Sequence, residues 1–129
     1  MNVVKTGKIT GTGAAINVSL GFVPDYVEVY NNNDAGSLWP TIKWWRGMAN
    51  GSGLKTLRVV DNGSTGNASQ NKVTTNGISA FNGSTAAARG FTIGADTDLN
   101  VNGEDMFFIA YRGTDGAFGK SDVNGAVVP

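Results

Sequence analysis

The chain has 129 residues, enough for one domain with its own hydrophobic core. Ten basic residues balance ten acidic ones and only 16% of the residues are charged, so the sequence lacks the electrostatic signature of a protein that binds nucleic acid or an anionic membrane. It has no cysteine, which excludes disulfides and thiolate metal sites, and no histidine, the usual general base of hydrolases. No stretch approaches the roughly 20 apolar residues of a membrane span, and the N-terminus lacks the apolar core of a signal peptide, so we expect synthesis in the cytoplasm without secretion.

The composition predicts an all-β fold. Nineteen glycines and many Asn and Thr residues disfavour long helices. Apolar alternation between turn residues predicts strands, in chain order, over Val3–Thr10, Ala14–Phe22, Tyr26–Tyr30, Thr41–Arg46, Leu54–Val60, Lys72–Thr75, Gly77–Phe81, Arg89–Ile93, Asp105–Arg112 and Ala126–Val128. This spacing is typical of an antiparallel β-sandwich or a jelly-roll-like barrel, and we interpret residues 1–129 as a single β domain.

Two segments of this domain are assigned separately. Residues 1–10 are a candidate N-terminal arm or edge strand, whose first residues Asn2, Val3 and Val4 would pair with the edge of a neighbouring molecule. Residues 61–85 are mostly polar and are punctuated by Asn-Gly pairs, which favour tight turns. They are therefore predicted to form one long polar loop that carries a short hairpin.

All three tryptophans of the chain, Trp39, Trp44 and Trp45, lie within SLWPTIKWWRGM, residues 37–48. Adjacent residues on a strand point to opposite faces, so Trp44 and Trp45 cannot both enter one core. Three interpretations of the outward tryptophan stay open. It lies under a loop, it anchors a contact with another protein chain beside Arg46, or it stacks on a sugar.

Two predicted strands have two different faces. In MFFIAYR, residues 106–112, both faces are apolar, with Met106, Phe108 and Ala110 on one and Phe107, Ile109 and Tyr111 on the other. In YVEVY, residues 26–30, the valines share one face while the tyrosines and the glutamate share the other. A strand that is apolar on both sides is typically central in a sandwich, or its second face is covered by a partner.

The segment DTDLNVNGED, residues 96–105, resembles a calcium loop at its start. Asp98, Asn100, Asn102 and Gly103 match the opening pattern, but the twelfth position holds Ile109 where a bidentate glutamate is required. The residues that follow predict a strand instead of the exit helix. We therefore predict a polar turn and no metal or other cofactor.

Catalysis by two carboxylates is the remaining enzymatic possibility. Glu28 and Glu104, each with an aspartate, would be the material for glycoside hydrolysis. Both occupy positions where solvent-facing residues or turns are expected, and a lone carboxylate in such a place is usually a solvated surface residue. The sequence thus predicts no catalytic residues and no enzyme.

The order of the motifs resembles a group of small virion proteins of tailed bacteriophages. Members show a Gly-Phe-x-Pro-Asp strand start, here Gly21–Asp25, then a strand with tryptophan, then a Gly-Phe-Thr-Ile-Gly segment, here Gly90–Gly94, before an aromatic strand. The resemblance spans most of the chain except residues 61–85. It implies a β-rich structural protein without catalytic residues, such as a capsid decoration or cement protein, and similar modules occur in tail and fibre proteins.

These observations together predict a non-enzymatic bacteriophage virion protein that stabilises the capsid from outside. Its partners would be the major capsid protein and copies of itself in a homo-oligomer, with no nucleic acid or membrane, and its location the virion after synthesis in the host cytoplasm. The predicted contact residues are Trp39, Trp44, Trp45, Arg46, Asn2, Val3 and Val4. The alternative is a tail, fibre or baseplate component that binds host glycan through the same aromatic side chains.

Overall fold

The fold was obtained as a computed structural model that describes residues 3–33, 39–61 and 65–113. Its strands are β1 (Val3–Thr10), β2 (Ile16–Ser19), β3 (Tyr26–Asn31), β4 (Thr41–Trp45), β5 (Ser52–Asp61), β6 (Thr65–Phe81), β7 (Gly90–Ile93) and β8 (Asp105–Arg112). No helix occurs among these described residues, so the all-β prediction is confirmed. The strand predicted at Ala126–Val128 lies outside them.

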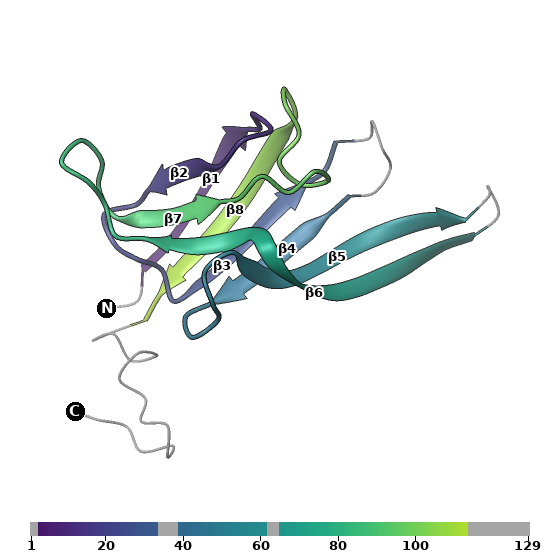
Figure 1. The fold of residues 1–129 in the computed structure, drawn as a ribbon, viewed down its shortest axis with the longest axis horizontal. Helices are drawn as coiled ribbons and strands as arrows, with labels where there is room; N and C mark the ends of the chain where they lie inside the picture. The colour runs from purple at the N-terminus through teal and green to yellow at the C-terminus, as the bar shows by residue number, and fades with distance from the viewer. Residues whose placement is uncertain (1–2, 34–38, 62–64, 114–129) are drawn as a thin grey trace, which may run out of the picture.

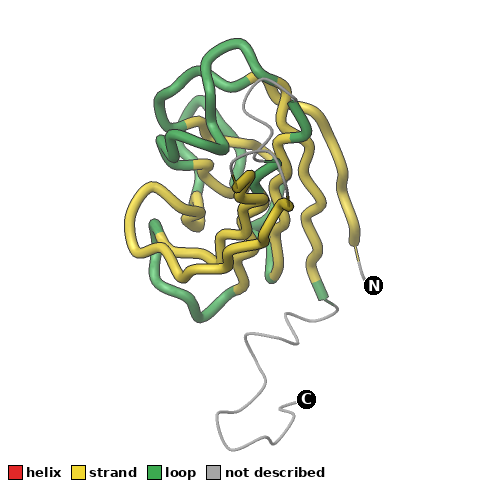
Figure 2. The backbone as a smooth tube through the Cα atoms, turned by 90° about the vertical axis from the view of Figure 1, so that its right-hand side faces the viewer, coloured by secondary structure: helices red, strands yellow, loops and turns green. Residues whose placement is uncertain are grey.

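All eight strands belong to one antiparallel sheet with the order β1-β8-β3-β4-β5-β6-β7-β2 (Figure 1). The sheet curls on itself into a half-barrel (Figure 2), so that β7 faces β8 across the interior, where the rings of Phe91 and Phe108 meet edge to face at 5.4 Å. Of the two predicted architectures, this single curled sheet is the barrel-like one. Its two edges, β1 and β2, are not hydrogen-bonded to each other as strands.

The concave face of the sheet holds the core. Inward positions recur at every second residue of the strands, as the pleat requires. The buried apolar side chains are Val18, Leu20, Phe22, Val27, Val29, Ile42, Trp44, Ile78, Phe91, Ile93, Leu99, Met106, Phe108 and Ala110. Burial of these side chains drives the curl, because only a concave face encloses them without a second layer.

The prediction of a long polar loop at residues 61–85 is wrong, because most of this segment is strand β6. β6 first pairs with β5 as far as Val73 and then, beyond a register shift opposite Ser52, pairs with β7 over Ile78–Phe81. Asn76 has a positive φ of 59°, so the pair Asn76-Gly77 makes a bend within one strand instead of a hairpin turn. Apolar alternation predicted parts of its second half, as the strands Lys72–Thr75 and Gly77–Phe81. It missed the first half, where Ala68 is the only apolar residue between Thr65 and Asn71.

The distal part of the β5–β6 pair extends beyond the rest of the sheet (Figure 1). β4 pairs with β5 only over Leu54–Thr56, and β7 joins β6 only from Ile78 onward. Residues 57–61 of β5 and 65–69 of β6 therefore pair with each other in a two-stranded ribbon. We call this part the β5–β6 ribbon.

Candidate interaction surface

The convex face of β1, β8, β3 and β4 carries large exposed apolar side chains. Strand register places Val4 beside Tyr111, Tyr111 beside Tyr26, and Tyr26 beside Trp45, in one row across four strands. Ile109 and Phe107 follow along β8 on the same face. We call this set the outer aromatic face: Val4, Tyr26, Trp45, Phe107, Ile109 and Tyr111.

Four side chains of the outer aromatic face are exposed to solvent although they are large and apolar. Val4 keeps 59% of its surface, Phe107 43%, Trp45 38% and Ile109 37%. The predicted two-sidedness of β8 is confirmed, because Met106 and its two inward neighbours are buried while the alternate residues face outward. Adjacent exposed apolar groups of this kind mark surfaces that contact other molecules.

The three tryptophans lie within seven residues of sequence but occupy three separate environments. Trp44 is 2% exposed and enters the core, where its indole N–H points to the carbonyl of Ala49 at 3.4 Å. Trp45 points to the opposite face, as alternation predicted. Trp39, 44% exposed, lies before the other end of β4, about 20 Å away along the strand, and stacks with the Arg58 guanidinium at 4.7 Å. Trp44 is therefore a core residue, and the prediction that it is a contact residue is wrong.

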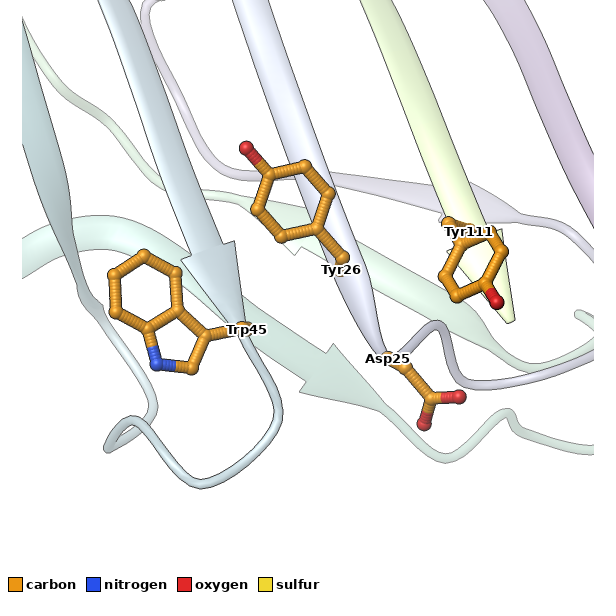
Figure 3. A pocket seen from close by; sticks show the side chains of 4 residues that line it. All are labelled: Asp25, Tyr26, Trp45 and Tyr111. Atoms are coloured by element: carbon orange, nitrogen blue, oxygen red, sulfur yellow. The ribbon is translucent and has the colours of Figure 1, made fainter. Parts of the chain in front are cut away.

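At one end of the outer aromatic face lies a hollow of about 510 Å³ lined by Asp25, Tyr26, Trp45 and Tyr111. Figure 3 shows the rings of Trp45 and Tyr111 on either side of Tyr26, each carried on its own strand. Three neighbouring strands thus supply one aromatic ring each. Such a concave apolar site suits an apolar side chain of a partner or the flat face of a sugar.

An ion pair between Arg46 and the buried carboxylate of Asp25 lies at the base of this hollow. Asp25 is 2% exposed, and its Oδ2 accepts the Gly113 N–H at 2.7 Å. Arg46 Nε lies 3.1 Å from Asp25 Oδ1 in an ion pair without hydrogen-bond geometry, while its Nη2 donates to the Val23 carbonyl at 2.9 Å. Arg46 was predicted as a contact residue. The structure gives it a positioning role beside the hollow, with its side chain still 37% exposed.

The centre of the outer face is polar. Glu28 accepts hydrogen bonds from the Tyr26 hydroxyl at 2.7 Å and from the Tyr30 hydroxyl, and Lys43 Nζ lies 4.0 Å away. Burial alone would raise the pKa of Glu28, but the hydrogen bonds from Tyr30 and Tyr26 and the charge of Lys43 outweigh it and hold that pKa below its ordinary value. Burial and the same carboxylate raise the pKa of Tyr30 to about 12, and that of Tyr26 also rises. Glu28 is thus a hydrogen-bonded network residue and not the solvated carboxylate that was expected.

Glu104 does not join Glu28. Its Oε1 accepts a hydrogen bond at 2.9 Å from the amide of Asn31, a buried residue on the concave side of β3, whereas Glu28 lies on the convex side. The sheet therefore separates the two carboxylates, and they form no acid–base pair of the glycosidase kind.

The N-terminal residues form an edge strand. β1 pairs with β8 along its whole length, from Val3 opposite Arg112 to Thr10 opposite Asp105. Of the two predicted alternatives, an arm or an edge strand, the structure has the edge strand. Val3 faces the core and Val4 the outer aromatic face, so Val4 is the residue of this pair available for contact. Asn2 lies outside the described residues.

The loop that resembles a calcium site is occupied by a lysine. Lys55 Nζ donates to Asp96 Oδ2 at 2.8 Å and to Asp98 Oδ2 at 2.7 Å. Burial alone would lower the pKa of Lys55, but its hydrogen bonds and charge pairing with Asp96 and Asp98 outweigh burial and raise that pKa. Asn100 is equally engaged, because its side chain accepts the Thr12 N–H at 2.9 Å and donates to two backbone carbonyls. In the described ranges, no group of three or more acidic side chains converges as a metal site.

Comparison with models of protein families, with curated proteins and with solved structures found no match for this chain. The described segments contain no helix with the length and apolar character needed to cross a bilayer.

Sequence reasoning missed Tyr26, Phe107, Ile109 and Tyr111 as members of one surface with Trp45. Alternation did put these side chains on the outer faces of their strands. What joins them is the pairing of β3 with both β4 and β8, and Tyr26 and Tyr111 are 85 residues apart in the chain.

Proposed function

We propose that the protein is a non-enzymatic virion protein of a tailed bacteriophage, a decoration or cement protein that binds the outer surface of the assembled capsid and stabilises it. The observation that carries the proposal is the outer aromatic face, a set of apolar side chains on the convex side of strands β1, β8, β3 and β4. The sequence resemblance at Gly21–Asp25 and Gly90–Gly94 supplies the class of partner. The major capsid protein is that partner, and the protein reaches the virion after synthesis in the host cytoplasm.

The size of the face fits one of many weak contacts. It spans three strand spacings, about 14 Å, and four residues along β8, about 13 Å, or on the order of 200 Å². A stable interface covers about 800 Å² on each partner. A single copy would therefore bind weakly, and many copies repeated over a shell, each linked to its neighbours, would bind strongly through multivalency. Equal numbers of acidic and basic residues suit such a coat, because neighbouring copies do not repel one another.

The direct test is uptake of the recombinant protein by purified expanded capsids, measured by co-sedimentation with the number of copies per shell. Trp45→Ala removes the largest side chain of the hollow and is expected to weaken uptake at least about tenfold, as the loss of an aromatic residue that anchors an interface does. Trp39→Ala is the matched control, since Trp39 is exposed to 44% against 38% for Trp45 but lies before the other end of β4, outside the outer aromatic face. Equal uptake of both variants and the wild type would refute the assignment of the contact surface, and no uptake by any shell would refute the decoration role.

The alternative is a tail, fibre or baseplate component that binds host glycan. The hollow favours it, because Tyr26, Trp45 and Tyr111 present aromatic rings of the kind that stack on sugars. A glycan array distinguishes the two functions. Binding that disappears in Trp45→Ala, with no capsid uptake, supports the glycan-binding role, whereas capsid uptake without sugar binding supports decoration.

A further inference from the structure

Strand β6 leaves a long edge open among the described residues. From Ala68 to Val73, β6 pairs with β5 on one side, and β7 begins to cover its other side only at Ile78. Every second residue of that stretch directs its backbone N–H and C=O away from β5. Such a row of backbone groups is a template for another strand.

This edge lacks the protection found at the other two edges. β1 carries Lys5 and Lys8, and β2 has only four residues. In β6, the stretch from Ala68 to Asn71 contains no charge and no proline, and its register with β5 is regular. Charges, prolines, bulges and short length are the usual means by which proteins block edge pairing. The side chains here are small or polar, and those of Ala68, Gln70 and Asn71 are exposed, which limits nonspecific aggregation but leaves the backbone accessible.

A second copy of the same chain is the partner that this edge fits. Two identical strands pair antiparallel about a two-fold axis, and the only charged residue of β6 is Lys72. In a two-fold pair, a residue lies opposite its own copy only where the axis passes through it. For an axis at any residue other than 72, each Lys72 therefore lies opposite an uncharged residue of the other copy. Pairing would also join the two copies edge to edge in the order β5-β6-β6-β5, and the β5–β6 ribbon of each copy, at residues 68 and 69, would gain a neighbouring strand.

We propose that the edge of β6 between Ala68 and Val73 pairs with the same edge of a second copy, forming a two-fold symmetric dimer. This interface is separate from the outer aromatic face and does not depend on the capsid role. It would supply the link between copies that multivalent binding needs.

A cysteine scan provides the first test, because the chain has no cysteine of its own. Single cysteines are placed in turn at residues 68 to 73, with Thr6→Cys in β1 and Ser84→Cys in a loop as controls at exposed sites. After mild oxidation, disulfide-linked dimers should peak at the position nearest the two-fold axis and decline on both sides. Equal cross-linking at the controls, or no peak along the scan, would overturn the proposal.

Charge exchange provides the second test and does not depend on disulfide geometry. Ser69→Lys with Asn71→Lys, and separately Ser69→Asp with Asn71→Asp, should each give monomers in sedimentation velocity, since like charges then face each other. An equimolar mixture should restore the dimer. Circular dichroism and thermal melting confirm that both variants fold. A wild-type protein that stays monomeric at about 100 µM, or charge variants that dimerise like the wild type, would rule the dimer out, whatever the capsid assay shows.

Discussion

Replacement of Lys55 by methionine is the sharpest test of the described packing. Lys55 is the only cation within salt-bridge distance of Asp96 and Asp98 in the described part of the chain, and its side chain is 12% exposed. Methionine keeps the length and the apolar stem but removes both charge-assisted hydrogen bonds. Asp96, with a side chain 8% exposed, then keeps a buried charge with no cation beside it.

The size of the effect follows from burial. Breaking a buried ion pair by removing one partner costs about 3–5 kcal/mol. The lower end applies here, because Asp98 is 30% exposed and Asp96 Oδ1 still accepts the N–H groups of Asp98 and Leu99 at 2.9 Å. We expect the free energy of unfolding to fall by about 3 kcal/mol at pH 7, and the melting temperature by about 12 °C.

The pH dependence gives the sign of the effect. The folded-state pKa of Lys55 lies above its ordinary value, so its contribution is complete below pH 10.5 and is lost as the pH rises through the folded pKa. Lys55→Met lacks this contribution at every pH. The difference in stability between variant and wild type should therefore be largest below pH 10.5 and should shrink as the pH rises through the folded-state pKa of Lys55.

Urea unfolding followed by tryptophan fluorescence measures both effects. Lys43→Met is the matched control, because Lys43 is 40% exposed and lies 4.0 Å from Glu28, so its loss should cost less than about 1 kcal/mol. If Lys55→Met lost no more stability than Lys43→Met, or if its difference from wild type did not shrink as the pH rose through the folded-state pKa of Lys55, the ion pair would not stabilise the fold as described.

Three further predictions concern other parts of the sheet. Glu28→Gln should lower the pKa of Tyr30 from about 12 toward 10, seen as earlier phenolate absorbance at 295 nm on alkaline titration, and an unchanged curve would contradict the hydrogen bond. Because the pKa of Glu28 is depressed, its contribution to stability is present above its ordinary value of 4.5 and is lost as the pH falls through the folded pKa, so wild type and Glu28→Gln should converge in acid. Phe91→Ala, at a fully buried ring, should cost about 3–5 kcal/mol in urea unfolding, and a loss under about 1 kcal/mol would place Phe91 outside the core. Gly90→Ala would put a methyl group 1.7 Å from the Val18 carbonyl oxygen, so amide exchange in β2 should accelerate more than in β3, and equal acceleration would argue against this close approach.

Local alternation predicted the faces of the strands well, for a physical reason. The pleat forces every second side chain to the same side, so the common face of Val27 and Val29, the common face of Met106, Phe108 and Ala110, and the division between Trp44 and Trp45 follow from the sequence alone. Which of the two faces is buried became clear only from the fold. The same rule failed for the first half of β6, because the residues from Thr65 to Asn71 are almost all polar and do not alternate with apolar ones. Its strand character comes from its backbone ladder with β5.

The composition of the interaction surface could not be predicted in the same way. It depends on which strands become neighbours, and the pairing of β8 between β1 and β3 brings together segments from both ends of the described chain. The role of Lys55 was hidden for the same reason, since the residues that bind it are 41 and 43 positions further along the chain. Only the fold shows that Asp98, the first residue of the calcium-like pattern, pairs with the ammonium group of Lys55.

The incomplete closure of the half-barrel determines where this molecule should come apart first. Along the seam, the Lys5 ammonium reaches from β1 to the Leu20 carbonyl just after β2, at 2.5 Å, and no backbone ladder joins the two strands. Parting the seam therefore breaks side-chain contacts, whereas parting any other pair of neighbouring strands breaks a row of backbone hydrogen bonds. Unfolding would begin at the two edge strands, β1 and β2, and proceed toward the middle of the sheet. A neighbouring molecule that binds either edge strand would therefore slow the unfolding of the whole domain without contacting its core.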